Sequence, residues 1–262
     1  MATRIHPTAI VHANAVIGEG CEIGPFCIVG KDAKLGARNR LIAHVVIEND
    51  VTLGEDNIAH PFAVLGGAPQ DLKYHGERTR LEIGNKNTIR ESVTLNLGTE
   101  GGGGLTKIGD QNLLMAYVHL GHDTIVGNNT VIANGCQIAG HVTIEDWAIL
   151  GGLSGVSQFV RVGAHCYVGG CSGVDRDVPP FIVARGPAGA VEVLGMNLVG
   201  LKRRGFESSE ISTLQEINKM FFKDKSLEKE AALQKLETTL GSSAVAKQFI
   251  TFVRSSEKGV CR

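Results

Sequence analysis

Aromatic residues, long apolar runs and an excess of one charge are scarce in this 262-residue chain. Aromatics make up 5% of it, with a single tryptophan, so a core built on aromatic packing is excluded. No apolar stretch approaches the ~18 residues that cross a bilayer, and we expect no stable membrane insertion. The net charge of −1 is too mild for a nucleic-acid-binding protein, which usually presents a strongly basic surface.

An aliphatic or alanine residue recurs at every sixth position. The series runs from Ile5 to Leu65, resumes in phase at Ile83, and after a slip of one residue continues from Ile108 to Val174. A period of six fits neither the ~3.6-residue turn of a helix nor the alternation of a strand. It predicts a hexapeptide solenoid, a parallel β-helix in which each repeat is one short strand and one turn. Three hexads form one triangular coil, so residues 18 apart stack on the same face.

Glycine and cysteine occupy particular slots in this repeat. Many of the 34 glycines directly follow the periodic residue, and we expect these positions to need a positive φ, which glycine adopts without strain. Cys21, Cys27, Cys136 and Cys166 lie four places after a periodic residue, in a slot that alanine fills elsewhere. They are interpreted as small apolar core residues of a reducing compartment. Because the repeat begins at Ile5, we expect no signal peptide and a cytoplasmic protein.

The repeat is interrupted twice and then ends. Residues 67–82 break the pattern and restore its phase, and residues 98–107 shift it by one. Both segments are expected to be loops expelled from the solenoid, where functional residues often lie. The repeat ends at the segment Asp177–Pro180, because two prolines do not continue a hydrogen-bonded ladder.

Apolar residues at three- and four-residue intervals predict three helices near the C-terminus. The expected segments run from Ser208 or Ser209 to Phe221, from near Ser226 to Gly241, and around Val245–Phe252. The predicted fold is mainly β: a parallel β-helix over residues 1–185, followed by an α-helical C-terminal domain over residues 186–262. Such solenoids usually associate, and a trimer would suit the triangular cross-section.

Stacking by 18 residues brings candidate catalytic groups together. His122, His141 and Gln158 lie two or three places after the periodic residue of successive coils, so we expect them on one strip beside both loops. Imidazole titrates near neutrality and can take a proton from a hydroxyl and return it to a leaving group. Asp123 would orient the His122 ring, which requires a turn because adjacent strand residues point to opposite faces. Four other histidines are expected to be solvated turn residues: His6, His12, His44 and His165.

Two further features bear on ligands. His119 and His122 form an H-x-x-H pair that, with His141, supplies the three nitrogens of a catalytic zinc site. No cysteine or glutamate completes a metal set, and we expect no metal. Residues 1–185 carry a net charge of −4 and residues 186–262 of +3. In the basic tail, the run Lys202–Arg204 suits a diphosphate or an acidic carrier protein.

The motifs of this chain resemble those of the UDP-N-acetylglucosamine acyltransferase family over nearly its whole length. The matching blocks are QDLKY (70–74), IRESV (89–93), GGGLTK (102–107), NLLM (112–115), HLGHD (119–123), AGHV (139–142), GGCSGV (169–174), DVPP (177–180) and GLKRRGF (200–206). The resemblance implies a homotrimer of left-handed β-helices with helical caps. It implies transfer of a 3-hydroxyacyl chain from acyl carrier protein to the glucosamine 3-position of UDP-N-acetylglucosamine, the first step of lipid A biosynthesis. No cofactor is implied beyond the carrier's phosphopantetheine thioester.

The resemblance also implies roles for single residues. His122 would be the general base, Asp123 would orient it, and the backbone N–H of Gly140 would stabilise the oxyanion. Gly170 matches the position that limits acyl-chain length. Substrate contacts would come from Asp71, Lys73, Asn96, His141 and Gln158, and from Asn197, Arg203 and Arg204 in the region that binds the nucleotide or the phosphopantetheine arm.

Three positions depart from the family pattern. Asn96 and Ser157 stand where histidine is common, and Val199 stands where glutamate is common. These departures leave open an N-acyltransferase that acts on a 3-amino UDP-sugar. A trimeric zinc-dependent hydratase of the same architecture is a second alternative. A non-catalytic scaffold is a third, which an exposed, regular array of threonine or asparagine would favour.

Overall fold

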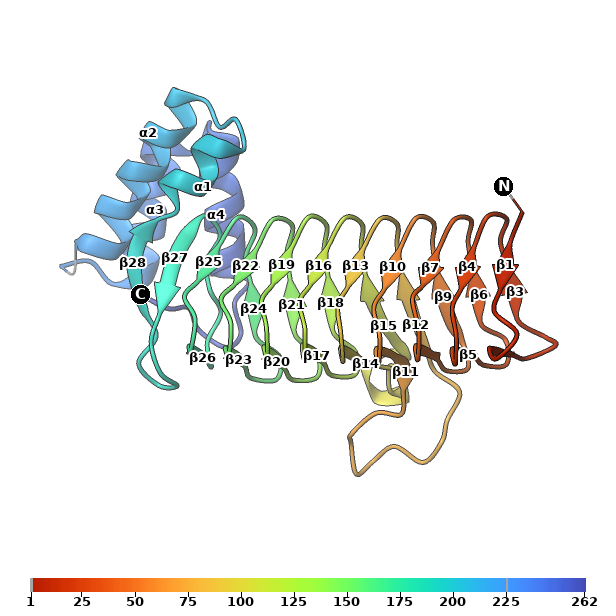
Figure 1. The fold of residues 1–262 in the computed structure, drawn as a ribbon. Coiled ribbons are helices and arrows are strands. Elements are labelled where there is room, and N and C mark those ends of the chain that lie inside the picture. Colours follow the sequence, from red (N-terminus) through yellow and green to blue (C-terminus); the bar gives the residue numbers. More distant parts are fainter. Residues whose placement is uncertain (1, 225) are drawn as a thin grey trace.

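The structure, a computed structural model, describes residues 2–224 and 226–262. The chain winds through a long stack of coils made of short strands, and the helices gather at the C-terminal end of the stack (Figure 1). The fold is mainly β, as the six-residue period predicts. The periodic residues fill a narrow aliphatic interior, and the four cysteines at 21, 27, 136 and 166 are fully buried and free among them.

Every third strand of the coil stack belongs to the same sheet. The first sheet consists of β1 (Arg4–Ile5), β4 (Glu22–Ile23), β7 (Arg40–Leu41), β10 (Ile58–Ala59), β13 (Thr88–Ile89), β16 (Leu113–Leu114), β19 (Val131–Ile132), β22 (Ile149–Leu150), β25 (Tyr167–Val168), β27 (Ile182–Arg185) and β28 (Glu192–Met196). The second consists of β2 (Ile10–Val11), β5 (Ile28–Val29), β8 (Val46–Ile47), β11 (Val64–Gly67), β14 (Thr94–Asn96), β17 (His119–Leu120), β20 (Gln137–Ile138), β23 (Gly155–Val156) and β26 (Gly173–Val174). The third consists of β3 (Val16–Ile17), β6 (Lys34–Leu35), β9 (Val51–Leu53), β12 (Arg80–Ile83), β15 (Leu105–Ile108), β18 (Ile125–Val126), β21 (Thr143–Ile144) and β24 (Arg161–Val162).

The parallel ladder extends further than the sequence predicts. Strand β27 pairs in parallel with β25, beyond the expected end of the repeat at Pro180, and β28 then adds to β27 in antiparallel orientation. The prolines lie in the turn before β27, where the ladder needs no N–H donor. The hairpin of β27 and β28 spans the predicted domain boundary between residues 185 and 186.

A column of buried asparagines shows how the two interruptions are accommodated. The backbone N–H of Asn57 donates to the side chain of Asn39, 18 residues earlier. The same bond joins Asn87 to Asn57 over 30 residues and Asn112 to Asn87 over 25 residues. The first insertion therefore adds two whole hexads and keeps the phase, whereas the second adds one residue more than a hexad and shifts it. The first loop projects from the stack between β11 and β12 (Figure 1); the second contains the 3₁₀ helix η1 (Glu100–Gly102).

The expectation that the repeat glycines supply positive φ angles is wrong for these positions apart from Gly66, which has a φ of 91°. Positive φ falls on the third residue after the periodic aliphatic, usually a non-glycine, as in Phe26, His44 and Asp123 with φ of 57°, 53° and 58°. The glycine directly after the strand is needed for space instead. A Cβ on Gly24 would lie 1.8 Å from the carbonyl oxygen of Ile42 in the next coil. Parallel strands stack at ~4.8 Å, and a side chain does not fit between them at this position.

The three predicted helices are present, with altered boundaries. The helical elements are α1 (Leu198–Arg203), α2 (Ser208–Ile217), the π-helix η2 (Asn218–Lys223), α3 (Lys229–Leu240) and α4 (Ala244–Arg254). The α2 N-cap is Glu207, which forms a capping box with Glu210, rather than a serine. The apolar spacing did not predict α1 or β28. Because β28 lies within residues 186–262, this segment is not purely helical. Within the described residues, each helix is too short or too polar to span a bilayer.

The asparagine column makes a testable contribution to stability. Asn87→Ala removes the buried donor to the carbonyl of Gly109 and the buried acceptor for the N–H of Asn112, both at 2.9 Å. We expect a loss of about 2–3 kcal/mol in the free energy of unfolding and a lower midpoint in thermal denaturation. Asn49→Ala is the matched control, because its side chain also accepts a backbone N–H but is exposed. Equal destabilisation of the two variants would contradict the role of buried pairing.

Candidate active site

His122 and Asp123 lie in the turn between β17 and β18, and their side chains contact each other. Nδ1 of His122 is 2.8 Å from Oδ2 of Asp123. The contact between neighbouring residues is possible because Asp123 has a φ of 58°, which provides the turn that the sequence analysis required. Both residues are buried. An imidazole whose Nδ1–H donates to a carboxylate presents its Nε2 lone pair as a base.

The second loop holds the Asp123 carboxylate from the opposite side. The backbone N–H of Thr99 donates to Oδ1 at 2.9 Å, and the Thr99 hydroxyl donates to Oδ2 at 2.6 Å. The N–H of Asp123 itself donates to the hydroxyl of Thr106 at 2.8 Å. Sequence reasoning missed both threonines. Both threonines lie in the segment that shifts the repeat, one coil below His122. This location could have predicted a contact with the His122 turn.

His141 lies one coil above and continues the cluster. Its ring meets the His122 ring edge-on with centroids 4.9 Å apart, and it stacks on Phe159 at 4.5 Å. Burial lowers the pKa of His141; the carboxylates of Asp123 and Asp71 oppose this shift, and His122 adds to it. The net direction keeps His141 neutral near pH 7, so it can serve as a hydrogen-bonding group rather than a cation.

The predicted strip of His122, His141 and Gln158 mixes two columns. Asp123, His141 and Phe159 occupy the positive-φ position of successive coils, so Phe159, and not Gln158, stacks on His141. Gln158 belongs with His122 and Gly140 in the neighbouring column, and its side chain is exposed. Residues 18 apart do stack on one another, as predicted, but positions two and three after the periodic residue face different directions.

Gly140 packs directly against the His122 ring. A Cβ at this position would lie 2.6 Å from Cε1 and Nε2 of His122, so glycine alone leaves the ring in place. Within residues 2–224 and 226–262, the N–H of Gly140 donates to no backbone or side-chain acceptor. An open N–H next to the basic nitrogen of His122 has the location that an oxyanion donor needs.

The first loop brings Asp71 and Lys73 to the same edge of the stack. They line a cavity of about 460 Å³ together with Thr99 and Glu100 of the second loop. This loop therefore lies next to the dyad, because Thr99 also bonds the Asp123 carboxylate. Asn96 is buried beneath the loop and anchors its start, because its side-chain N–H groups donate to the carbonyls of Gly67 and Ala68 at 3.3 and 3.1 Å.

Asn197 and Arg204 lie on a different edge of the stack. The side chain of Asn197 caps α1 by accepting the N–H of Gly200 and donates to the carbonyl of His165. The Arg204 guanidinium is 3.4 Å from Nδ1 of His165 and lies over the ring of Trp147. Arg203 is exposed. One chain therefore does not bring these residues to His122.

The expectation that His165 is a solvated turn residue is wrong. Its ring is stacked between Trp147 and Phe181 and meets Phe206 edge-on. Burial, reinforced by the positive charge of Arg204, lowers the pKa of His165 to about 4. Nδ1 can accept from Arg204 while the ring is neutral, so the helical end of the protein is joined to the coils through an uncharged imidazole.

Three ligand atoms of His122, Asp123 and His141 lie within 4.8 Å of one another, a separation that also suits a metal ion. His119, the third histidine of the zinc alternative, is not part of this group; its Nδ1 is 2.8 Å from the hydroxyl of Thr94. Oδ2 of Asp123 already interacts with Thr99 and His122. A metal bound at Oδ2 would have to displace these two interactions.

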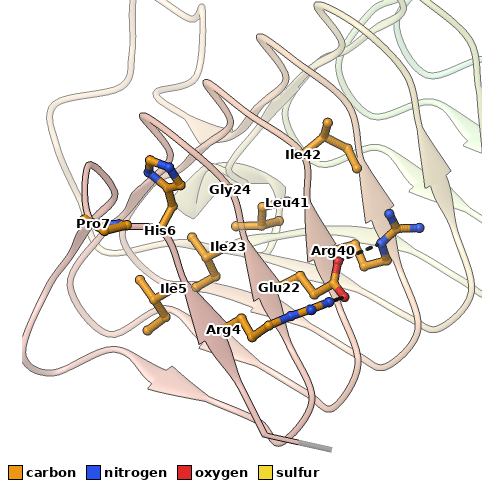
Figure 2. A pocket seen from close by; sticks show the side chains of 10 residues that line it. All are labelled: Arg4, Ile5, His6, Pro7, Glu22, Ile23, Gly24, Arg40, Leu41 and Ile42. Carbon is orange, nitrogen blue, oxygen red and sulfur yellow. Dashed lines mark hydrogen bonds and ion pairs between the residues drawn. The ribbon is translucent and has the colours of Figure 1, made fainter.

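Another hollow, of about 470 Å³, lies at the N-terminal end of the stack (Figure 2). The Glu22 carboxylate sits between Arg4 and Arg40 there and pairs with both. One carboxylate thus pairs with two guanidinium groups, beside aliphatic residues that include Ile23 and Leu41. This hollow lacks the buried proton-transfer pair of the turn after β17, which is therefore the better candidate site.

The stacked coils of short parallel strands are the architecture of a hexapeptide-repeat protein. A family model described as bacterial transferase hexapeptide matches residues 105–140, and one described as UDP-N-acetylglucosamine O-acyltransferase, domain 2, matches residues 177–261. An acyl-[acyl-carrier-protein]–UDP-N-acetylglucosamine O-acyltransferase of Burkholderia lata is 47% identical and covers 99% of this chain and 100% of its own. The chain belongs to the UDP-N-acetylglucosamine O-acyltransferase family.

Solved structures agree with this assignment. The UDP-N-acetylglucosamine acyltransferase of Francisella novicida superposes with a TM-score of 0.95 at 36% identity, over 98% of this chain and 94% of the other. The enzyme of Moraxella catarrhalis superposes with a TM-score of 0.92 at 39% identity, over 98% and 99% of the two chains.

The buried state of His165 predicts an acid sensitivity. Because its pKa of about 4 lies below the ordinary value of about 6.5, the unfolded chain takes up a proton between these values and the folded chain does not. Stability from this residue is complete above pH 6.5 and is lost as the pH falls toward 4. We expect His165→Gln to show a smaller drop in melting temperature between pH 7 and 5 than the wild type. Identical pH slopes for the two proteins would contradict the assignment.

Proposed function

We propose that this protein transfers a 3-hydroxyacyl chain from acyl carrier protein to the 3-hydroxyl of the glucosamine ring of UDP-N-acetylglucosamine, the first step of lipid A biosynthesis. The observation that carries the proposal is the buried His122–Asp123 pair facing the open N–H of Gly140. Family membership supports the substrate class.

His122 acts as the general base in the proposed step. Its Nε2 takes the proton of the sugar hydroxyl as the oxygen attacks the thioester carbonyl. Asp123 holds the Nδ1–H and balances the positive charge that forms on the ring. The carbonyl oxygen becomes an oxyanion, which the N–H of Gly140 stabilises. The intermediate then expels the phosphopantetheine thiolate, which takes the proton from His122, and the products are the ester and the free carrier thiol.

The residues around the dyad would position the sugar. Asp71, Lys73 and His141 lie at the same edge, and Gln158 is exposed one coil above Gly140. Asn96 would act indirectly in this proposal, because it fixes the start of the loop that carries Asp71 and Lys73. The proposed step needs no metal, since Oδ2 of Asp123 accepts from the Thr99 hydroxyl and faces Nδ1 of His122.

A homotrimer would complete the site. We propose left-handed coils with the helices as a C-terminal cap, so that Asn197, Arg203 and Arg204 of one copy approach the dyad of another. The separation of these residues from His122 within one chain supports this arrangement. The net charge of +3 on residues 186–262 suits an acidic carrier protein, and we expect the reaction to take place in the cytoplasm.

Replacement of the base is the direct test. His122→Ala should lower kcat/KM by about 10²–10⁴-fold while the oligomer and its melting temperature are retained. The assay follows product mass with UDP-N-acetylglucosamine and a 3-hydroxyacyl carrier, and runs in parallel with the 3-amino analogue. His12→Ala, an exposed histidine in an N-terminal coil, is the control. Retained activity in His122→Ala would refute the mechanism, and a strict preference for the amino sugar would reassign the acceptor.

Gly170 provides a test of chain-length control. A Cβ at this position would lie 3.2 Å from the carbonyl oxygen of Gly152, so a side chain fits after a small shift. We expect Gly170→Met to shift preference toward shorter chains, by about fourfold in kcat/KM for each methylene group that is excluded. Competition among carriers of graded acyl length measures the effect. An unchanged profile would count against a role for Gly170 in chain length.

A further inference from the structure

We propose that Thr99 is a positioning residue for the catalytic dyad and that Thr99 and Gly102 together form a rigid support for the Asp123 carboxylate. The proposal rests on the function proposed above. It concerns a residue that acts through Asp123 on His122, without contact to substrate.

Thr99 engages both oxygens of the carboxylate. The N–H donates to Oδ1 and the hydroxyl donates to Oδ2, at 2.9 and 2.6 Å. Oδ2 also faces Nδ1 of His122 at 2.8 Å, so the hydroxyl and the imidazole share one acceptor. Thr99 and Asp123 are both buried. A buried carboxylate without such donors would carry a large desolvation cost, and two donors from one residue fix its plane as well as its charge.

The direction of the Thr99 hydroxyl is set by the turn that it caps. The oxygen accepts the N–H of Gly102 at 3.2 Å. The carbonyl of Thr99 accepts the N–H groups of Gly102 and Gly104, at 3.0 and 2.7 Å. Because the N–H of Gly102 points at the Thr99 hydroxyl oxygen, the hydroxyl proton is directed to Asp123. The loop therefore fixes the orientation of the Thr99 hydroxyl and of its hydrogen bond to Asp123, because the hydroxyl group does not rotate freely.

Gly102 closes the support from the other side. A Cβ on Gly102 would lie 2.0 Å from Cγ of Asp123, so the carboxyl group packs directly on the backbone of the turn. The neighbouring Gly101 has open space around its Cβ direction. The two adjacent glycines thus provide a matched pair: one supports Asp123 and the other does not.

The position of Thr99 predicts a change in the basicity of His122. Without the hydroxyl, Oδ2 has one donor fewer and interacts more strongly with a protonated His122 ring. The other titratable groups near this ring are Asp123 and His141, with Asp71 facing His141. A general base must be neutral, so the acid limb of the rate profile moves to higher pH.

The first experiment compares Thr99→Val with Thr99→Ser in the full-length enzyme. We expect Thr99→Val to lower kcat by about 10-fold, with KM values near those of the wild type and the acid limb raised by on the order of one pH unit. Thr99→Ser keeps the hydroxyl and should restore both quantities. A wild-type rate and pH profile in Thr99→Val would overturn the proposal. So would an equal loss in both variants without a shift of the acid limb, because that result indicates a structural role.

A second comparison covers the case in which Thr99→Val does not fold. Gly102→Ala should lower kcat by about 10-fold or more, because the added methyl displaces Asp123 from His122. Gly101→Ala should remain within about threefold of the wild type. Neither glycine has a positive φ, so alanine suits both backbones. Equal activity of the two alanine variants would overturn the proposal.

An NMR titration of the His122 ring separates this proposal from the proposed function. The pKa is measured in the wild type, Thr99→Val and Thr99→Ser without substrate. If the pKa rises in Thr99→Val and returns in Thr99→Ser while the wild type fails to acylate UDP-N-acetylglucosamine, the positioning role holds and the proposed function fails. If the wild type is active and the pKa is the same in all three proteins, the proposed function holds and the positioning role fails.

Discussion

Each coil of this protein stacks on the next at the distance of a parallel β-ladder, and the chain has to satisfy that spacing in every turn. Where two backbones meet after a strand, a side chain does not fit: a Cβ on Gly109 would lie 2.6 Å from the carbonyl oxygen of Gly127. At the corners, non-glycine residues adopt a positive φ that is ordinarily unfavourable. The preceding coil compensates, because the corner N–H donates to one of its carbonyls, as His44 does to Pro25 at 3.0 Å.

The same constraint explains why the proposed site lies where the repeat is interrupted. Asp32 and Asp50 occupy the same corner as Asp123 in lower coils, but they are partly exposed and pair with the surface residue Arg78. Asp123 is buried because the second loop lies over it and supplies Thr99. The same segment also supplies the acceptor for the corner N–H of Asp123, which donates to the hydroxyl of Thr106 instead of to a backbone carbonyl. A regular coil would leave this carboxylate in solvent.

The fold was predictable from the sequence because its defining interaction is periodic. The period placed His122 near His141 and identified the strands and the two expelled loops, except that residues 80–82 and 105–107, expected in the loops, belong to β12 and β15. It did not reveal that Phe159 stacks on His141, since direction within a turn depends on φ rather than on spacing. Thr99 was missed because a hydrogen bond from an irregular loop leaves no periodic signal. The aromatic environment of His165 was missed because Phe206 comes from a segment with no repeat.

The neutral state of His141 matters for the chemistry proposed at His122. Two imidazoles with centroids 4.9 Å apart would repel each other if both were protonated. Burial and the proximity of His122 lower the pKa of His141 more than the carboxylates of Asp123 and Asp71 raise it. In the proposed step, the positive charge that would form on His122 therefore faces the Asp123 carboxylate and no second cation. The stacking of His141 on Phe159 contributes to this balance, since the aromatic ring withholds water from the face of His141 that it covers.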